Sequence, residues 1–146
     1  MRSCAYNPSA ARYAIDAPSV LRVVADNVEV HPDHQIVAPS VIRSDALSLL
    51  FEAVRRGELT EETALRCHER LTELKMRLLA DRVSRRMAWK IASEQGWDST
   101  RAAEYLAVTS LQADALVTID PDLITKASGL VPLASLDDLT AQAGRS

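Results

Sequence analysis

Apolar residues along the chain alternate between two patterns, short continuous runs and longer stretches with helical spacing. The short runs predict strands over residues 12–16, 36–38, 115–118 and 131–133. The helical spacing predicts helices over residues 17–25, 41–56, 60–78, 82–95, 100–112 and 121–126, with a last helix beginning at residue 136. Short apolar strands separated by helices are typical of parallel strands joined by crossover helices. The pattern therefore predicts an α/β fold with a short parallel sheet flanked by helices.

Two of the predicted helices form an amphipathic hairpin over residues 41–78. Gly57 ends the first helix, and Thr60 is placed to cap the start of the second. The apolar stripe of the second helix consists of Leu65, Leu71, Leu74 and Leu78. We expect this hairpin to suit dimerisation or the docking of a partner.

Length and composition add no further elements to this prediction, but they exclude several classes of protein. The chain has 146 residues, which fits one domain over residues 12–146 preceded by a tail over residues 1–11. Apolar residues make up 47%, which excludes wholesale disorder, and the net charge of -3 excludes a generally basic nucleic-acid binder. No apolar run is long enough for a membrane span. Cys4 and Cys67 are predicted to be free thiols, as in a cytoplasmic protein.

Acidic residues follow two of the predicted strands directly. Asp16 comes after Ile15, and Asp120 comes after the run that ends at Ile119. A carboxylate at the end of a buried strand loses hydration unless it is paired or bound to a metal ion. Each acid could instead cap the helix that follows it. Two such acids at the carboxyl ends of parallel strands favour a cation site, and oxygen ligands favour Mg²⁺ or Mn²⁺.

Asp45 is a third candidate for the same edge of the sheet. It lies early in the helix that follows the second predicted strand. An acid in the first turn of a helix is also favoured by the helix dipole alone. The position of Asp45 is therefore consistent with either role.

Several short motifs, in order, resemble a PIN domain of the VapC toxin type. They are residues 13–17 (YAIDA), residues 37–40 (VAPS) leading to Asp45, residues 103–107 (AEYLA) and residues 116–120 (LVTID) with Leu123 after them. The resemblance covers about residues 12–140. It implies a three-layer α/β fold, a Mg²⁺- or Mn²⁺-dependent endoribonuclease that acts as the toxin of a toxin–antitoxin pair, and a protein antitoxin as partner. PIN domains often dimerise, so the resemblance also implies a homodimer.

The resemblance assigns roles to individual residues. It implies that Asp16, Asp45 and Asp120 are catalytic metal ligands and that Thr118 supports them. The family's remaining acid, three residues before the tyrosine that here is Tyr105, falls on Ala102. A missing ligand weakens metal binding, so a catalytically degenerate PIN domain that binds RNA or protein is the alternative function.

Three nearby acids are candidates to replace the acid missing at Ala102. Asp98 lies one helical turn earlier on roughly the same face, and Asp122 lies two residues after Asp120. Glu104 falls near the opposite face of the helix from Ala102. Their alternative roles are a helix cap for Asp98, a surface acid for Glu104 and a helix-start acid for Asp122.

One segment is strongly basic although the chain is acidic. Residues 75–90 contain six basic residues and a single acid, Asp81. Four of the basic residues recur at helical spacing and are predicted to contact the phosphates of RNA: Arg82, Arg85, Arg86 and Lys90. An ordinary solvated helix face is the alternative. Aromatic residues make up only 4% of the chain, so stacking on bases is expected to contribute little.

Overall fold

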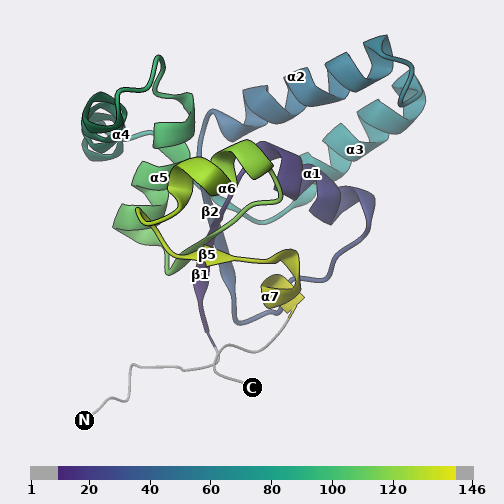
Figure 1. Ribbon diagram of the computed structural model, residues 1–146. Helices are drawn as coiled ribbons and strands as arrows, with labels where there is room; N and C mark the ends of the chain where they lie inside the picture. Colours follow the sequence, from purple (N-terminus) through teal and green to yellow (C-terminus); the bar gives the residue numbers. More distant parts are fainter. Residues whose placement is uncertain (1–9, 141–146) are drawn as a thin grey trace.

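The computed structural model describes residues 10–140, which form a five-stranded parallel sheet with helices on both faces (Figure 1). The strands are β1 (Arg12–Ile15), β2 (Gln35–Pro39), β3 (Arg77–Leu79), β4 (Ala115–Val117) and β5 (Leu133–Ala134). The helices are α1 (Ala17–Ala25), α2 (Ile42–Arg55), α3 (Glu61–Glu73), α4 (Arg82–Gln95), α5 (Arg101–Gln112), α6 (Pro121–Ala127) and α7 (Leu136–Thr140). The predicted α/β class is confirmed.

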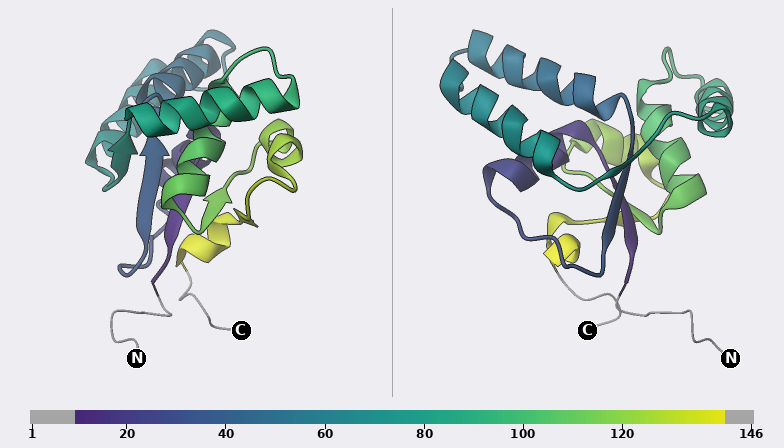
Figure 2. Two further views of the ribbon diagram at one scale, coloured as in Figure 1. Left: turned by 90° about the vertical axis from the view of Figure 1, so that its left-hand side faces the viewer. Right: turned by 180° about the vertical axis from the view of Figure 1, so that it is seen from behind.

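The helices form the outer two layers of a three-layer fold. On one face α1, α2 and α3 pack against one another, and on the other α5 packs on β1 and β2 with α4 beyond it. Figure 2 shows the α2–α3 hairpin and the α4–α5 pair on opposite sides of the molecule. The sheet between them is buried on both faces, and Ala14, Leu116 and Val117 have no exposed surface. Continuous apolar strands are typical of such a covered parallel sheet.

The prediction of one helix over residues 60–78 is wrong at its end. Helix α3 ends at Glu73, and residues 77–79 form β3, whose Leu78 pairs with Ala38 of β2. Leucines three and four residues apart fit a helix, but pairing with β2 satisfies the backbone of this segment in the sheet instead. The last strand also begins two residues later than predicted, at Leu133.

The strand order places the ends of β1 and β4 together. The order is β3-β2-β1-β4-β5, so β1 lies between β2 and β4. Ile15 is in register with Val117, and the residues that follow them, Asp16 and Thr118, therefore leave the sheet side by side. The order reverses here, because the chain extends the sheet to one side after β1 and to the other side with β4. Such reversal points are where ligands bind in open α/β sheets.

The predictions of free cysteines and of no membrane-spanning segment can be compared with the structure only over the described residues. Cys67 is a half-buried free thiol, whereas Cys4 and most of the predicted tail lie outside residues 10–140. Among the helices of that range, none combines the length and the apolar character that a membrane span needs.

Candidate functional site

Asp16 is buried at the junction of β1 and α1. Its side chain is 2% exposed. One carboxylate oxygen accepts a hydrogen bond from the backbone N–H of Ser19 (3.3 Å), which caps α1, and the other accepts one from the Thr118 hydroxyl (2.7 Å). The sequence favours this geometry because Pro18 occupies the first turn, where a helix needs no N–H donor from it. Asp16 therefore caps a helix and also faces β4.

Asp120 repeats this arrangement at the end of β4. Its Oδ1 accepts a hydrogen bond from the backbone N–H of Asp122 (3.0 Å), and Pro121 begins α6. Thr118 joins the two acids, because its hydroxyl donates to Asp16 and accepts from the backbone N–H of Asp120 (3.1 Å). Within residues 10–140 the Oδ2 atom of Asp120 has no hydrogen bond or ion pair, so it remains available to a ligand.

The electrostatic environment of Asp16 opposes its charge. Burial raises the pKa of Asp16, hydrogen bonds from Ser19 and Thr118 lower it, and the neighbouring Asp120 raises it again, so that the pKa lies above its ordinary value. A buried carboxylate with a second, half-buried carboxylate nearby is stabilised in its charged form by a cation.

Asp45 lies in the same region but is already paired. It is in the first turn of α2, and Arg101 at the start of α5 approaches its Oδ1 to 2.9 Å. The Tyr105 hydroxyl donates to its Oδ2 over 2.7 Å. Burial and the Asp45 carboxylate raise the pKa of Tyr105 far above its ordinary value, so the hydroxyl stays a donor. Sequence reasoning missed Arg101, which is 56 residues away from its partner.

One cavity of about 620 Å³ collects most of the predicted site residues. Asp16, Asp45, Asp98, Asp120 and Asp122 all line it, and so does Ala102. Six acidic side chains line the cavity in all, because Glu52, which sequence reasoning also missed, completes the set. Its basic side chains are Arg101 and Lys126. The structure therefore brings Asp98 and Asp122 to the region of Ala102.

Glu104 is the one predicted acid that lies elsewhere. It lines a second cavity of about 520 Å³ on the other side of α5, together with Arg85 and Trp89. This placement follows from the helical spacing, which puts Glu104 far around the helix from Ala102.

The donor set fits a cation at one part of the cavity. In residues 10–140, no three His, Cys, Asp or Glu side chains stand in an arrangement that would hold a metal ion by themselves. Asp16 and Asp120 nevertheless offer carboxylate oxygens at one place. Mg²⁺ is commonly held by one or two carboxylates while it keeps several waters. The pair therefore fits a hydrated Mg²⁺ or Mn²⁺, whereas the charge of Asp45 is already matched by the Arg101 guanidinium.

Comparison with known proteins bears on the fold. No protein-family model and no curated sequence matches the chain. Among solved structures, PAE2754 from Pyrobaculum aerophilum matches with a TM-score of 0.65 and 21% identity, over 89% of this chain and 94% of that one. VapBC-1 from nontypeable Haemophilus influenzae matches with a TM-score of 0.57 and 16% identity, over 86% of this chain and 98% of that one. The chain has a PIN-like fold. The fold that the sequence resemblance implied is therefore confirmed.

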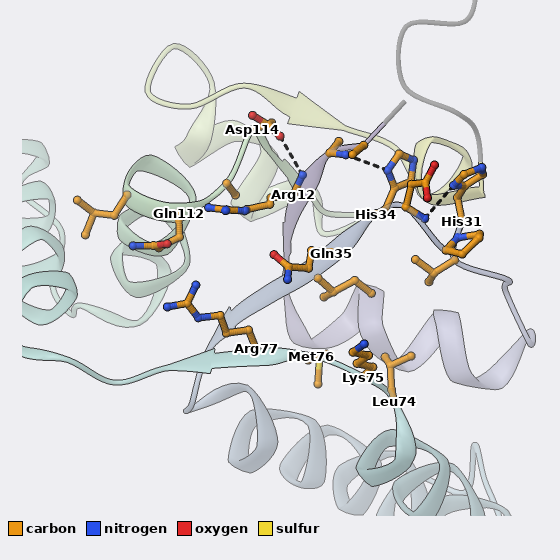
Figure 3. A pocket seen from close by; sticks show the side chains of 18 residues that line it. Arg12, His31, His34, Gln35, Leu74, Lys75, Met76, Arg77, Gln112 and Asp114 are labelled. Carbon is orange, nitrogen blue, oxygen red and sulfur yellow. Dashed lines mark hydrogen bonds between the residues drawn. The ribbon is translucent and has the colours of Figure 1, made fainter. Parts of the chain in front are cut away.

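Another cavity, of about 840 Å³, lies at the opposite edge of the sheet (Figure 3). Its polar side chains hold the start of β1: Asp114 accepts a hydrogen bond from the backbone N–H of Arg12 (2.8 Å). Lys75 and Arg77 also line it, so the basic segment of residues 75–90 is divided between the two edges. Ligands of open α/β sheets bind at the carboxyl ends of the strands, which favours the carboxylate cavity as the site.

The rest of the basic segment lies on helix α4, and two residues connect β3 to this helix. Four basic side chains of α4 are exposed, and within the described part of the chain none of them forms an ion pair: Arg82, Arg85, Arg86 and Lys90. Trp89 shares their face of the helix and is 73% exposed. The α4 face is therefore an unpaired basic surface that carries one aromatic ring.

Proposed function

We propose that the protein is a Mg²⁺- or Mn²⁺-dependent endoribonuclease that acts in the cytoplasm as the toxin of a toxin–antitoxin pair. The observation that carries the proposal is the carboxylate pair Asp16 and Asp120, joined by Thr118 at the ends of two adjacent parallel strands. The likeness of the fold to VapBC-1 supports it.

Each residue of the pair has a defined part in this proposal. Asp16 and Asp120 would hold the ion, which would supply Lewis acidity for the hydrolysis of a phosphodiester. Thr118 fixes the orientation of both acids through its hydroxyl, which contacts the Asp16 carboxylate and the Asp120 backbone. Burial at the end of β1 keeps the Asp16 side chain in a single orientation and limits its contact with bulk water.

The charge of the cavity makes a cation necessary for this substrate. Six acidic and two basic side chains line it. An RNA phosphate that approached this surface alone would meet net negative charge. A divalent ion held by Asp16 and Asp120 would reduce that repulsion.

Cleavage in the presence of Mn²⁺ tests the proposal. Purified protein incubated with structured RNA and Mn²⁺ is expected to cut it, and EDTA is expected to stop the reaction. Asp120→Asn should lower the cleavage rate at least about tenfold, because changes even outside the ligand shell cost roughly 10–100-fold. Asp114→Asn, at the opposite edge of the sheet, is the matched control and should cut like the wild type. Equal background cutting by wild type and Asp120→Asn would exclude the enzyme.

One observation favours a second candidate function. Ala102 lies in the cavity at the position where the resemblance implies an acid. A PIN domain that binds RNA without cutting it is therefore the alternative. The same assay separates the two functions, because this alternative gives a shifted RNA band and no cleavage products.

The α4 face supplies the path for the RNA in this proposal. Replacing Arg82, Arg86 and Lys90 together with alanine is expected to weaken RNA binding and to reduce the slope of log affinity against log salt concentration by about two. The reason is that binding releases fewer counterions from the RNA for each phosphate contact that the variant has lost. A control variant with the same loss of charge replaces Arg22, Arg55 and Arg66, which are exposed on α1, α2 and α3. An unchanged slope in the α4 variant would show that the RNA takes another path.

The α2–α3 hairpin supplies the partner surface in this proposal. The helices pair along their length, and the hairpin still exposes Leu47, Phe51 and Leu65, between 49% and 65% of each side chain. Exposed apolar side chains on a helical hairpin suit an amphipathic partner segment. We place the antitoxin, or a second copy of the chain in a homodimer, on this surface.

A further inference from the structure

Arg101, Asp45 and Tyr105 form one connected group at the wall of the carboxylate cavity. Arg101 Nη2 lies 2.9 Å from one oxygen of Asp45, and the Tyr105 hydroxyl lies 2.7 Å from the other. The Asp45 side chain is only 16% exposed, whereas that of Arg101 is 73% exposed. The carboxylate is therefore an inner support, and the guanidinium is the part of the group that faces solvent.

This geometry gives Asp45 a role other than metal binding, namely contact with Arg101 and Tyr105. Its negative charge is matched by a guanidinium at ion-pair distance, and its second oxygen accepts a hydrogen bond from Tyr105. Both oxygens of Asp16 also accept hydrogen bonds, but from the neutral donors Ser19 and Thr118, so its charge stays unmatched. A cation at Asp45 would have to displace Arg101. Asp16 and Asp120, by contrast, face no basic side chain within ion-pair distance in residues 10–140.

Arg101 retains donors for an anion while it is held in this way. Its contact with Asp45 uses a single nitrogen, and a guanidinium carries five N–H groups in a planar fork. That fork matches the oxygens of a phosphate. The other basic side chain of the cavity is engaged on two sides, because Lys126 pairs with Asp122 (3.3 Å) and lies 5.5 Å from the ring centre of Trp97.

Resting on the proposed ribonuclease function, we propose that Arg101 binds a phosphate of the RNA beside the Asp16–Asp120 pair, and that Asp45 and Tyr105 are positioning residues which hold its side chain. The cavity then has two parts, a carboxylate pair for the cation and a buttressed guanidinium for the substrate. Asp45 acts through Arg101 and is not a metal ligand.

Binding of RNA without cleavage tests the role of Arg101. The affinity of a short fluorescent single-stranded RNA is measured in EDTA by anisotropy. Arg101→Ala is expected to weaken binding about tenfold, as the loss of a charge-assisted hydrogen bond does. The RNA affinity of Arg101→Lys should lie between those of the wild type and Arg101→Ala, because lysine keeps the charge but lacks the planar fork of N–H donors. Arg66→Ala is the matched control, since Arg66 also pairs with a carboxylate, on α3. Wild-type affinity in Arg101→Ala would overturn the proposal.

A double-mutant cycle tests the positioning role with Tyr105→Phe, a substitution that changes no charge, in the presence and absence of Arg101. Tyr105→Phe removes one of the two hydrogen bonds that hold Asp45. It is expected to weaken RNA binding about two- to threefold when Arg101 is present, because more side-chain freedom is then lost on binding. In the Arg101→Ala background it should have no effect. An equal loss in both backgrounds would mean that Tyr105 acts through the structure as a whole, and would overturn its assignment.

Titration with Mn²⁺ separates this proposal from the proposed function on which it rests. Asp16→Asn is expected to weaken Mn²⁺ binding at least about tenfold, whereas Asp45→Asn and Arg101→Ala should each change it by less than about threefold. A loss in Asp45→Asn as large as in Asp16→Asn would overturn the positioning role, and a tenfold gain in Arg101→Ala would show that Arg101 occupies the place of the cation. If Asp16→Asn leaves Mn²⁺ binding and RNA cleavage unchanged, the proposed function fails, and the anisotropy result still decides the role of Arg101.

Discussion

Replacing Asp16 with asparagine is expected to make the metal-free protein more stable while it weakens Mn²⁺ binding at least about tenfold. The Asp16 carboxylate is 2% exposed and faces Asp120, and burial raises its pKa. Asparagine keeps the shape and removes the buried charge. We expect the free energy of unfolding to rise by about 1 kcal/mol, which corresponds to roughly 3 °C in Tm for a domain of this size.

Thermal unfolding in EDTA measures this effect, and its pH dependence has a definite sign. Because the pKa of Asp16 is higher in the folded than in the unfolded protein, the charged side chain destabilises the fold at pH values above the folded pKa. The advantage of the variant should therefore shrink as the pH falls towards the ordinary value of 3.8. Asp137→Asn, at an exposed site on α7, should change the stability by less than about 0.5 kcal/mol. A loss of stability in Asp16→Asn would show that its hydrogen bonds outweigh the cost of burying its charge.

Replacing Ala102 with aspartate is expected to strengthen Mn²⁺ binding at least about tenfold and to raise the rate of RNA cleavage. Ala102 is half-buried and lines the cavity with Asp16 and Asp120, so an added carboxylate would extend the donor set. The fold should accept this change because an acid in the first turn of α5 is favoured by the helix dipole. Mn²⁺ titration and the rate of RNA cleavage are the measurements.

Ala102→Asn is the control for this gain, since it has the same shape without the charge. It should bind Mn²⁺ like the wild type. Equal gains in both variants would mean that size or hydrogen bonding at this position matters and that charge does not. No gain in Ala102→Asp would mean that Asp98 or Asp122, which line the same cavity, already supplies the missing carboxylate.

The strands and helices around the site were predictable because each has a strong local signal. The run that ends at Ile15 is apolar and is followed by an acid and a proline-containing helix start, and the run before Asp120 has the same form. Both acids were expected at the carboxyl edge of the sheet, and both lie there. Whether they bind a metal stays a prediction.

Other features depend on contacts between distant segments and had no local signal. Leu78 continues a helical leucine pattern, yet pairing with Ala38 places it in a strand. The Asp45–Arg101 pair joins residues on two helices that no sequence motif relates. The basic segment looked continuous along the sequence, but β3 separates its two parts. Arg77 lines the cavity at one edge of the sheet, and Arg82 begins α4 after the other end of β3.

The contact between Asp16 and Thr118 spans 102 positions of the chain. At a synthesis rate of about 5–20 residues per second, roughly 5–20 s pass between the addition of these two residues. A growing chain holds Asp16 at the end of its first strand throughout that interval, but it has no partner acid from β4 beside it. Translation itself therefore imposes a delay during which the emerging polypeptide cannot assemble the carboxylate pair, however much of its sheet has already folded.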